Sequence, residues 1–440
     1  MRRIHIQAFT LIEMLVALTA SLILFGSVMT IFQILGETVR KSRQMGELDS
    51  QICSFKGIVL NDLAGVTARR SASGLDCPAN AGVGASGYFE IIEGPNSDLL
   101  DFSVTPPYDR STNMAGPPGG DSNDRIVGDT DDLLFFTTQS VSGDPFYGKF
   151  EDATIESPQA EVAYFCTRTP DTANPTLYTL RRRQLLIVGS FSTPTPPFDN
   201  NSSQAFTEWG SNWVTFLDRY DLSVRLETGR IILNGGTDLL ARRNRFAHDP
   251  SISGANVGIA KLNLAQNSPV WNVLSLAGTR SGEDILFTNV LSFDVKVIDN
   301  KPDVRQRQTT NTARMQPGDL DFWTSGTTSE VVPSGNVYVD LGFNASRPAG
   351  FQAVSWGYFG NYGSGTSSHV LSGTVATSRT YDTWTTHYMT NSLSDDGNAV
   401  VDDDEGPPYP TPLAGIQITL RLYEPSSKAI RQTTISQSFQ

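Results

Sequence analysis

The chain has 440 residues, a net charge of -13 and 39% hydrophobic residues. This length and composition suffice for a sizeable core, in two or three domains of ordinary size or in one domain with long insertions. The acidic balance and the absence of a large basic patch argue against nucleic-acid binding. The 38 glycines and 24 prolines indicate many turns and loops. The composition therefore predicts a folded body with long connections.

An apolar segment begins close to the N-terminus. Hydrophobic character runs over residues 9–35, with Glu13 as its only charge. The uncharged part, residues 14–36, has about 23 residues, which as a helix reach about 35 Å and exceed the roughly 30 Å of a bilayer's hydrocarbon core. A removable signal peptide has a shorter apolar region, followed by a small-x-small cleavage site that is not found here with the right spacing. The segment therefore predicts a membrane-spanning helix.

The residues around the start of this segment form a recognisable string. A short leader with two arginines ends at Ala8, and Phe9-Thr-Leu-Ile-Glu13 follows. This string resembles the N-terminus of type IV prepilins, a family that includes the pseudopilins of type II secretion. In that family a membrane peptidase cuts just before the phenylalanine and methylates the new amine. The resemblance implies cleavage between Ala8 and Phe9 and N-methylation of Phe9, although the family usually has glycine where this chain has Ala8. An uncleaved anchor is the alternative.

The resemblance also implies a role for Glu13. A carboxylate within lipid is costly unless it is paired or lies at the interface. In the family, the glutamate at the fifth mature position pairs with the N-terminal amine of a neighbouring subunit. This implies that Glu13 is an assembly contact, and the alternative is the polar end of an ordinary single-pass anchor.

The family also implies a location and partners. It implies a single-pass protein of the inner (cytoplasmic) membrane, with the leader in the cytoplasm and the head in the periplasm or outside the cell, or in a filament after assembly. The partners would be the prepilin peptidase, other pilin or pseudopilin subunits and the inner-membrane assembly platform. Charge alone leaves the orientation open, because Arg2 and Arg3 precede the segment and Arg40, Lys41 and Arg43 follow it.

A second helical pattern follows the membrane segment. Apolar residues recur there at steps of three and four, which is one face of a helix. They are Met45, Leu48, Ile52, Phe55, Val59, Leu63 and Val66. No proline interrupts residues 9–72, and Gly74 is a typical helix stop. We therefore expect a leader at 1–8 and one stem helix with a membrane-spanning half at 9–36 and an amphipathic half at 37–73.

Residues 74–440 show strand patterns separated by loops rich in Pro, Gly, Ser and Asn. Strands are predicted at 88–92, 99–104, 132–138, 161–167, 177–187, 213–216, 222–227, 231–233, 285–298 and 337–341. Apolar and polar residues alternate most clearly at 416–422, and a turn after Glu424 leads into residues 431–439, which predicts a C-terminal hairpin. The expected fold class is α+β, with a pilin-like long N-terminal helix packed on an antiparallel, loop-rich β-domain.

The sequence contains no motif of a known enzyme class. Its four histidines are far apart, and it has neither H-E-x-x-H nor G-x-S-x-G nor a Cys/His cluster. The cysteines Cys53, Cys77 and Cys166 match no metal or redox spacing. They allow three disulfide pairings or buried free thiols. We therefore expect a protein that is not an enzyme.

An acidic stretch at 391–406 is the best candidate for a metal site. Acids lie around the turn residue Gly397 and after an apolar pair, and carboxylate oxygens are the ligands that Ca²⁺ prefers. The candidate calcium ligands are Asp395, Asp396, Asp402, Asp403, Asp404 and Glu405. Serines occupy two positions where an EF-hand has acids, so the alternatives are a looser calcium loop and a solvated acidic linker.

The large head bears on the function that the resemblance implies. A repeating filament must accommodate every head around its stem bundle, so the size of this head favours a minor subunit of a pilus or pseudopilus, at the tip or in initiation. The competing class is a membrane-anchored, adhesin-like binding module that uses a prepilin anchor without polymerising. Its stacking surfaces would come from Trp209, Trp213, Trp356 and Trp384.

Overall fold

The computed structural model describes residues 10–76, 86–93, 100–101, 108–109, 130, 132–168, 177–188, 205–206, 213–227, 229–246, 248, 276, 278–299, 305–307, 314–315, 327–328, 337–342, 380–383, 409, 411–425, 427 and 429–440. The chain forms two compact units. One unit comprises Met1–Ser54 with Glu424–Ala429, and the other comprises Phe55–Tyr423 with Ile430–Gln440. The second unit contains the β-domain.

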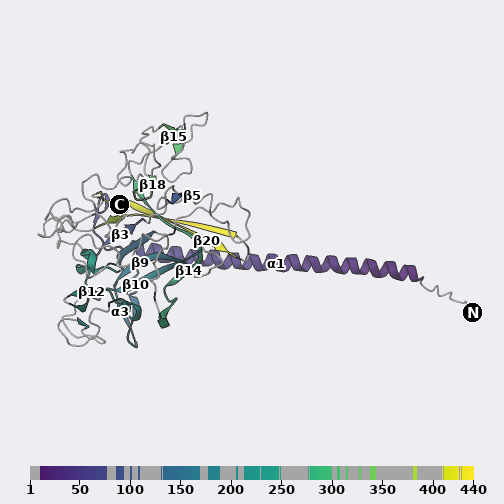
Figure 1. The fold of residues 1–440 in the computed structure, drawn as a ribbon, viewed down its shortest axis with the longest axis horizontal. Coiled ribbons are helices and arrows are strands. Elements are labelled where there is room, and N and C mark those ends of the chain that lie inside the picture. The colour runs from purple at the N-terminus through teal and green to yellow at the C-terminus, as the bar shows by residue number, and fades with distance from the viewer. Residues whose placement is uncertain are drawn as a thin grey trace, which may run out of the picture. The chain divides into compact units, whose positions relative to one another are not determined.

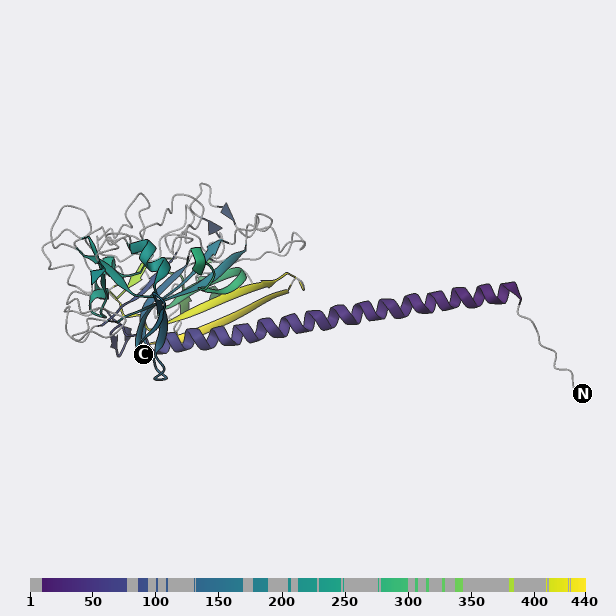
Figure 2. The same cartoon turned by 90° about the horizontal axis from the view of Figure 1, so that it is seen from below.

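The N-terminal helix α1 (Leu11–Ala64) is 54 residues long and unbroken (Figures 1 and 2). Thr10 precedes it and exchanges hydrogen bonds with Glu13 in the reciprocal pattern of a capping box. Its large apolar side chains are exposed from Leu11 to Val39. Among the residues that the structure describes, α1 is the one helix long and apolar enough to cross a membrane. The prediction of a long apolar N-terminal helix is therefore confirmed.

The helix ends at Ala64, earlier than the expected end at residue 73, because the chain reaches strand β6 (Leu133–Gln139) at that point. The last four carbonyl groups of a helix lack intrahelical partners, and all four are satisfied here. The acceptors Asn61, Asp62, Leu63 and Ala64 receive hydrogen bonds from Gly65 N, Thr138 Oγ1, Val66 N and Arg70 Nη2, respectively. A short hairpin of β1 (Arg70–Ser71) and β2 (Gly74–Leu75) follows in place of the expected helix.

The β-domain is built on a nine-stranded sheet with the order β19-β3-β6-β9-β10-β14-β20-β21, in which β18 also pairs with β14. From β3 to β21 the order in space follows the order in the chain, so the sheet is a meander with insertions. The other strands are β3 (Phe89–Ile92), β9 (Gln159–Arg168), β10 (Tyr178–Leu186), β14 (Ile285–Asp299), β18 (Val337–Val339), β19 (Thr380–Asp382), β20 (Gly415–Glu424) and β21 (Ala429–Ser438). The strand pairs described residue by residue are antiparallel.

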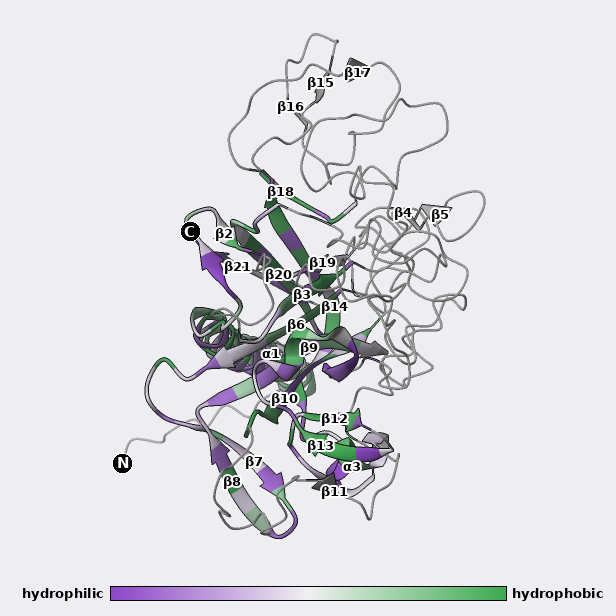
Figure 3. Cartoon of the chain, turned by 90° about the vertical axis from the view of Figure 1, so that its left-hand side faces the viewer, coloured by the Kyte–Doolittle hydropathy of each residue, from purple (hydrophilic) through white to green (hydrophobic). Residues whose placement is uncertain are grey.

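Side chains on these strands alternate between two covered faces. One face packs against the last turns of α1, where Phe55, Val59 and Leu63 are at most 2% exposed. The ring of Phe55 lies edge-on to Phe287 of β14, with 5.5 Å between the ring centroids. The opposite face carries a second apolar cluster that includes Phe135 of β6. Burial on both faces explains why the central strands are coloured as hydrophobic over much of their length in Figure 3.

The connections between the sheet strands carry the smaller elements. Between β3 and β9 lie β4 (Leu100–Asp101), β5 (Tyr108–Asp109), β7 (Phe146–Phe150) and β8 (Ala153–Ser157). Between β10 and β14 lie β11 (Ala205–Phe206), α3 (Trp213–Arg219), β12 (Val224–Glu227), β13 (Arg230–Leu233), η2 (Asp238–Leu240), η3 (Arg242–Asn244) and η5 (Gly278–Arg280). After β14 come β15 (Arg305–Arg307), β16 (Arg314–Met315) and β17 (Thr327–Thr328). The segment between β10 and β14 covers the sheet face opposite α1.

Most of the predicted strands are confirmed, including the C-terminal hairpin, which is β20 and β21. One was wrong: residues 213–216 begin helix α3. A run of four residues is too short for its periodicity to distinguish a strand from a buried helix. The strand predicted at 99–104 is described only at β4. The structure thus confirms an α+β chain with one long apolar helix and a largely antiparallel β-domain.

Candidate functional site

Two parts of the structure bear on function: the start of α1 and a buried polar cluster in the β-domain. Of the residues that the prepilin resemblance singles out, Ala8 and Phe9 lie outside the described residues. Glu13 lies in the first turn of α1 and is exposed. The structure therefore bears on the geometry of Glu13, while the cleavage site stays a prediction.

The carboxylate of Glu13 closes the first helical turn. Thr10 donates to Glu13 Oε2 from both its backbone N–H and its hydroxyl, each at 2.9 Å. The backbone N–H of Glu13 in turn donates to Thr10 Oγ1 at 3.4 Å. Among the described residues, no hydrogen bond reaches the second oxygen, Oε1. The same carboxylate can therefore cap its own helix and still accept a donor from outside the chain.

The remaining polar groups of the apolar half of α1 are mostly satisfied within the helix. The hydroxyls of Thr19, Ser21, Ser27 and Thr30 donate to backbone carbonyls three or four residues earlier. A hydroxyl paired in this way needs no water, so it does not oppose contact with lipid. Glu13 is the charged group of this segment, and a charge there requires an interface or a partner.

The amphipathic pattern in the second half of α1 agrees with the structure. Its apolar members Leu48, Ile52, Phe55, Val59, Leu63 and Val66 are buried. Of the two cysteines that the structure describes, Cys53 is exposed with a free thiol, and Cys166 is buried. Cys77 lies outside the described residues.

The calcium candidates Asp395, Asp396, Asp402, Asp403, Asp404 and Glu405 all lie outside the described residues. Within the residues that the structure does describe, no group of three or more His, Cys, Asp or Glu side chains is arranged to hold a metal ion. The calcium prediction for the acidic stretch therefore stays a prediction.

Glu161 of β9 is the centre of a buried polar cluster on the sheet face opposite α1. Three donors converge on its carboxylate: Tyr88 Oη at 2.6 Å, Ser223 Oγ at 2.7 Å and Phe246 N at 2.7 Å. Burial raises the pKa of Glu161, and these hydrogen bonds oppose that rise. The same burial raises the pKa of Tyr88 well above its ordinary value, with a further contribution from the charge of Glu161. The phenol of Tyr88 therefore stays protonated and donates a hydrogen bond to the carboxylate of Glu161.

Arg245 occupies the other side of this cluster and is fully buried. Its Nη1 donates to Glu90 of β3 at 3.1 Å and to Asp382 of β19 at 2.7 Å, and its guanidinium lies 4.1 Å above the ring of Tyr88. Burial lowers the pKa of Arg245, but the two carboxylates outweigh it, so the pKa lies above its ordinary value. The ring of His248 lies between Phe246 O, at 3.0 Å, and Glu90 Oε1, at 3.2 Å. The cluster thus joins β3, β9 and β19 to the segment between β10 and β14.

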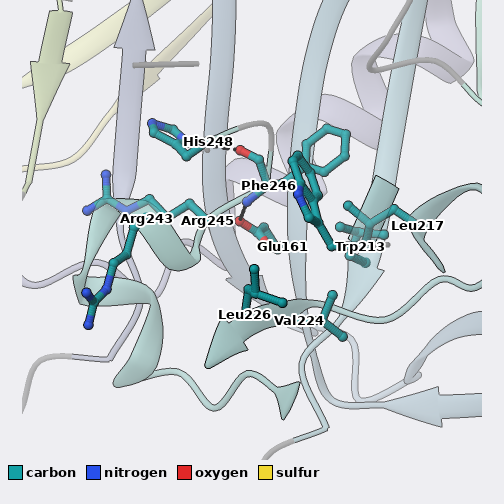
Figure 4. A pocket seen from close by; sticks show the side chains of 10 residues that line it. Glu161, Trp213, Leu217, Val224, Leu226, Arg243, Arg245, Phe246 and His248 are labelled. Carbon is teal, nitrogen blue, oxygen red and sulfur yellow. Dashed lines mark hydrogen bonds between the residues drawn. The ribbon is translucent and has the colours of Figure 1, made fainter. Parts of the chain in front are cut away.

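A small pocket adjoins the cluster (Figure 4). Its volume is about 10 Å³, which is close to the smallest space that can hold one water molecule. Trp213 and Leu217 lie on one side of Glu161, and Arg243 and His248 lie on the other. The buried polar and charged groups of the cluster are paired with one another, and these pairs connect neighbouring elements of the β-domain.

Trp213 is the one proposed stacking tryptophan that the structure describes. It is half-buried and packs against the apolar cluster beneath α3. Trp209, Trp356 and Trp384 lie outside the described residues. The one tryptophan that can be placed therefore serves packing, as buried aromatic residues usually do.

Sequence reasoning missed two features of these sites. The capping box was visible in principle, because Thr10 and Glu13 have the Ser/Thr-x-x-Glu spacing that marks a helix start. The buried cluster gave no such signal, because Arg245 is 155 residues from Glu90 and 137 from Asp382. Only the folded sheet brings these charges together.

Comparisons with known proteins add no relative: no protein-family model, no curated protein and no solved structure matches this chain.

Proposed function

We propose that this chain is a minor pilin-like or pseudopilin-like structural subunit, assembled through α1 into a type IV pilus or a type II secretion pseudopilus, at the tip or in initiation. A prepilin peptidase would cut between Ala8 and Phe9 and methylate Phe9. Before assembly, the chain would be held in the inner membrane as a single-pass protein, with its head on the far side from the cytoplasm. Its partners would be other pilin or pseudopilin subunits and the inner-membrane assembly platform.

One observation carries this proposal: an unbroken helix of 54 residues whose apolar half is exposed and whose first turn holds the carboxylate of Glu13. Exposed apolar side chains over such a length require lipid or other helices to cover them. A soluble, self-sufficient domain would bury this surface within itself.

The geometry of Glu13 adds support. Cleavage before Phe9 would place a new amine next to the capped first turn of α1. The amine of a neighbouring subunit could then pair with Glu13 Oε1, the oxygen that the cap leaves open. A buried charge is tolerated when such a partner is supplied.

The first test is the mature N-terminus. We would express the full chain with and without a prepilin peptidase, extract it from membranes, and determine its intact mass and N-terminal sequence. The proposal expects a start at Phe9 with one added methyl group, and only when the peptidase is present. Ala8→Gly, which restores the residue usual in the family, is the matched control and should be processed at least as completely.

A start at Met1 in both the natural chain and Ala8→Gly would overturn the processing step. The protein would then be an uncleaved anchor, and its head would have to be studied as a tethered binding module. In that case, binding of polysaccharide by the full chain in detergent would favour the adhesin-like alternative, whereas binding of pilin heads would not.

A further inference from the structure

The last turns of α1 carry a buried carboxylate that none of the functional arguments above uses. Asp62 is 2% exposed although it lies in the apolar contact between helix and sheet. Arg182 of β10 donates to it through two nitrogens, Nε to Oδ2 at 2.8 Å and Nη2 to Oδ1 at 3.0 Å. Tyr164 of β9 donates its phenolic hydrogen to the same carboxylate. Residues 164 and 182 are direct cross-strand partners, so the strand pair holds the two donors in a fixed position relative to each other.

The protonation states suit this arrangement. Burial raises the pKa of Tyr164 well above its ordinary value, and the charge of Asp62 raises it further. Burial lowers the pKa of Arg182, but Tyr164 and Asp62 outweigh this effect, and the net shift is upward. The phenol of Tyr164 therefore stays protonated and donates a hydrogen bond, and the guanidinium of Arg182 stays charged.

The apolar contacts beside this group do not define a single position for the helix. Phe55, Val59 and Leu63 are spaced four residues apart, about one helical turn. A slide of α1 by one turn would move each of these side chains toward the place of its neighbour and keep apolar atoms in contact. The same slide would bring Ile58 opposite Arg182 and leave two buried charges without partners. The side-chain contact of Asp62 distinguishes the two positions along the helix where the apolar stripe does not, and the backbone hydrogen bond from Gln139 N to Gly65 O does so just beyond its end.

We propose that Asp62, Arg182 and Tyr164 form a register lock that fixes the axial and rotational position of the last turns of α1 on the sheet. Replacing a buried ion pair by apolar residues of similar size often leaves stability unchanged or higher, while one well-attested use of such pairs is to select a unique register. The lock therefore contributes specificity of position more than stability. This inference does not depend on membrane insertion or on filament assembly.

The test separates position from stability in the full chain in detergent micelles. Nitroxide labels at Leu60→Cys on α1 and Glu156→Cys on β8, both exposed sites, report by pulsed electron paramagnetic resonance the distance between α1 and the β7-β8 hairpin, which leads directly into β9 of the sheet. Cys53 and Cys77 are changed to serine, and the buried Cys166 is left. The natural lock should give one narrow distance distribution. Asp62→Leu with Arg182→Met and Tyr164→Phe, which leaves no member of the lock without a partner, should keep the melting temperature but broaden the distribution or add a population displaced by up to about 5.4 Å, one helical turn.

The matched control removes a comparably buried ion pair that does not involve α1. Lys296 of β14 pairs with Asp340, and the two side chains are 15% and 12% exposed. Lys296→Met with Asp340→Leu should leave the distance distribution narrow. If the lock variant does not fold, Asp62→Asn keeps the shape of the side chain without its charge, and it should also broaden the distribution. A single narrow peak at the natural distance in the folded lock variant would overturn the proposal.

Discussion

The backbone N–H of Gln139 donates to the carbonyl oxygen of Gly65 at 2.8 Å, and a Cβ atom on Gly65 would lie 2.0 Å from Gln139 O. The end of α1 is thus in direct backbone contact with the end of β6. No side chain fits between them, so the point at which the helix stops is set by the approach of this strand.

The first prediction concerns this contact. Gly65→Ala should destabilise the protein by about 1–3 kcal/mol, because the new methyl group meets backbone atoms that cannot rotate away. Gly57→Ala, inside α1, is the control, since a Cβ there meets nothing within 4 Å, and it should stabilise by about 0.5–1 kcal/mol through helix propensity. Thermal unfolding of the full chain in detergent measures both. Equal melting temperatures for the two variants would contradict the contact.

The second prediction separates the two roles of Glu13. Glutamine also completes a capping box, so Glu13→Gln should keep the first turn of α1 while it removes the charge. If the charge is the assembly contact, Glu13→Gln and Glu13→Ala should both be lost from filaments sheared from cells. Thr10→Ala removes the cap but keeps the charge, and it should still be incorporated. Normal incorporation of Glu13→Ala would exclude Glu13 as the assembly contact.

The sequence predicted well those parts of the fold that arise from neighbouring residues. The helical stripe that includes Phe55 and Leu63, and the alternation in β20, are local patterns, and both lie as expected. The end of α1 was misplaced because it depends on β6, where Thr138 contacts Asp62 across 76 residues. No local pattern records such an encounter.

The polar sites divide in the same way. Glu13 stands out in the sequence because it interrupts an apolar run. Arg182 and Asp62, which are 120 residues apart, looked like an ordinary strand residue and an ordinary polar position on a helix. Their pairing follows from the register between β9 and β10 and from where the helix lies on the sheet, and neither can be inferred from spacing.

The third prediction concerns pH. The folded protein raises the pKa of Glu161 above its ordinary value of 4.5, chiefly through burial. The folded state therefore holds this proton to a higher pH than the unfolded state does. The resulting stabilisation is complete below pH 4.5 and is lost as the pH rises through the raised pKa.

Glu161→Gln tests this sign, because glutamine does not titrate. The free energy of unfolding of the natural chain minus that of Glu161→Gln should decrease as the pH is raised from 4.5, as measured by denaturant unfolding at a series of pH values. The hydrogen bond that glutamine cannot accept adds a constant offset and does not change the slope. Glu156→Gln, at an exposed site, should give a curve parallel to that of the natural chain. A difference that grows with pH would mean that the hydrogen bonds to Glu161 outweigh its burial.

The fourth prediction concerns calcium and the acidic stretch at 391–406. If its aspartates bind Ca²⁺, a concentration one hundred times the dissociation constant should stabilise the protein by about 2.7 kcal/mol, and EDTA should reverse the effect. Asp395→Asn combined with Asp396→Asn and Asp403→Asn should abolish both this stabilisation and the heat of binding in calorimetry. The control variant, Asp144→Asn with Asp152→Asn, removes exposed acids elsewhere and should leave both unchanged. If millimolar Ca²⁺ produces no heat and no rise in melting temperature, the stretch is a solvated linker. Carboxylates that bind Ca²⁺ exchange bound water for the ion, and calorimetry would detect that exchange.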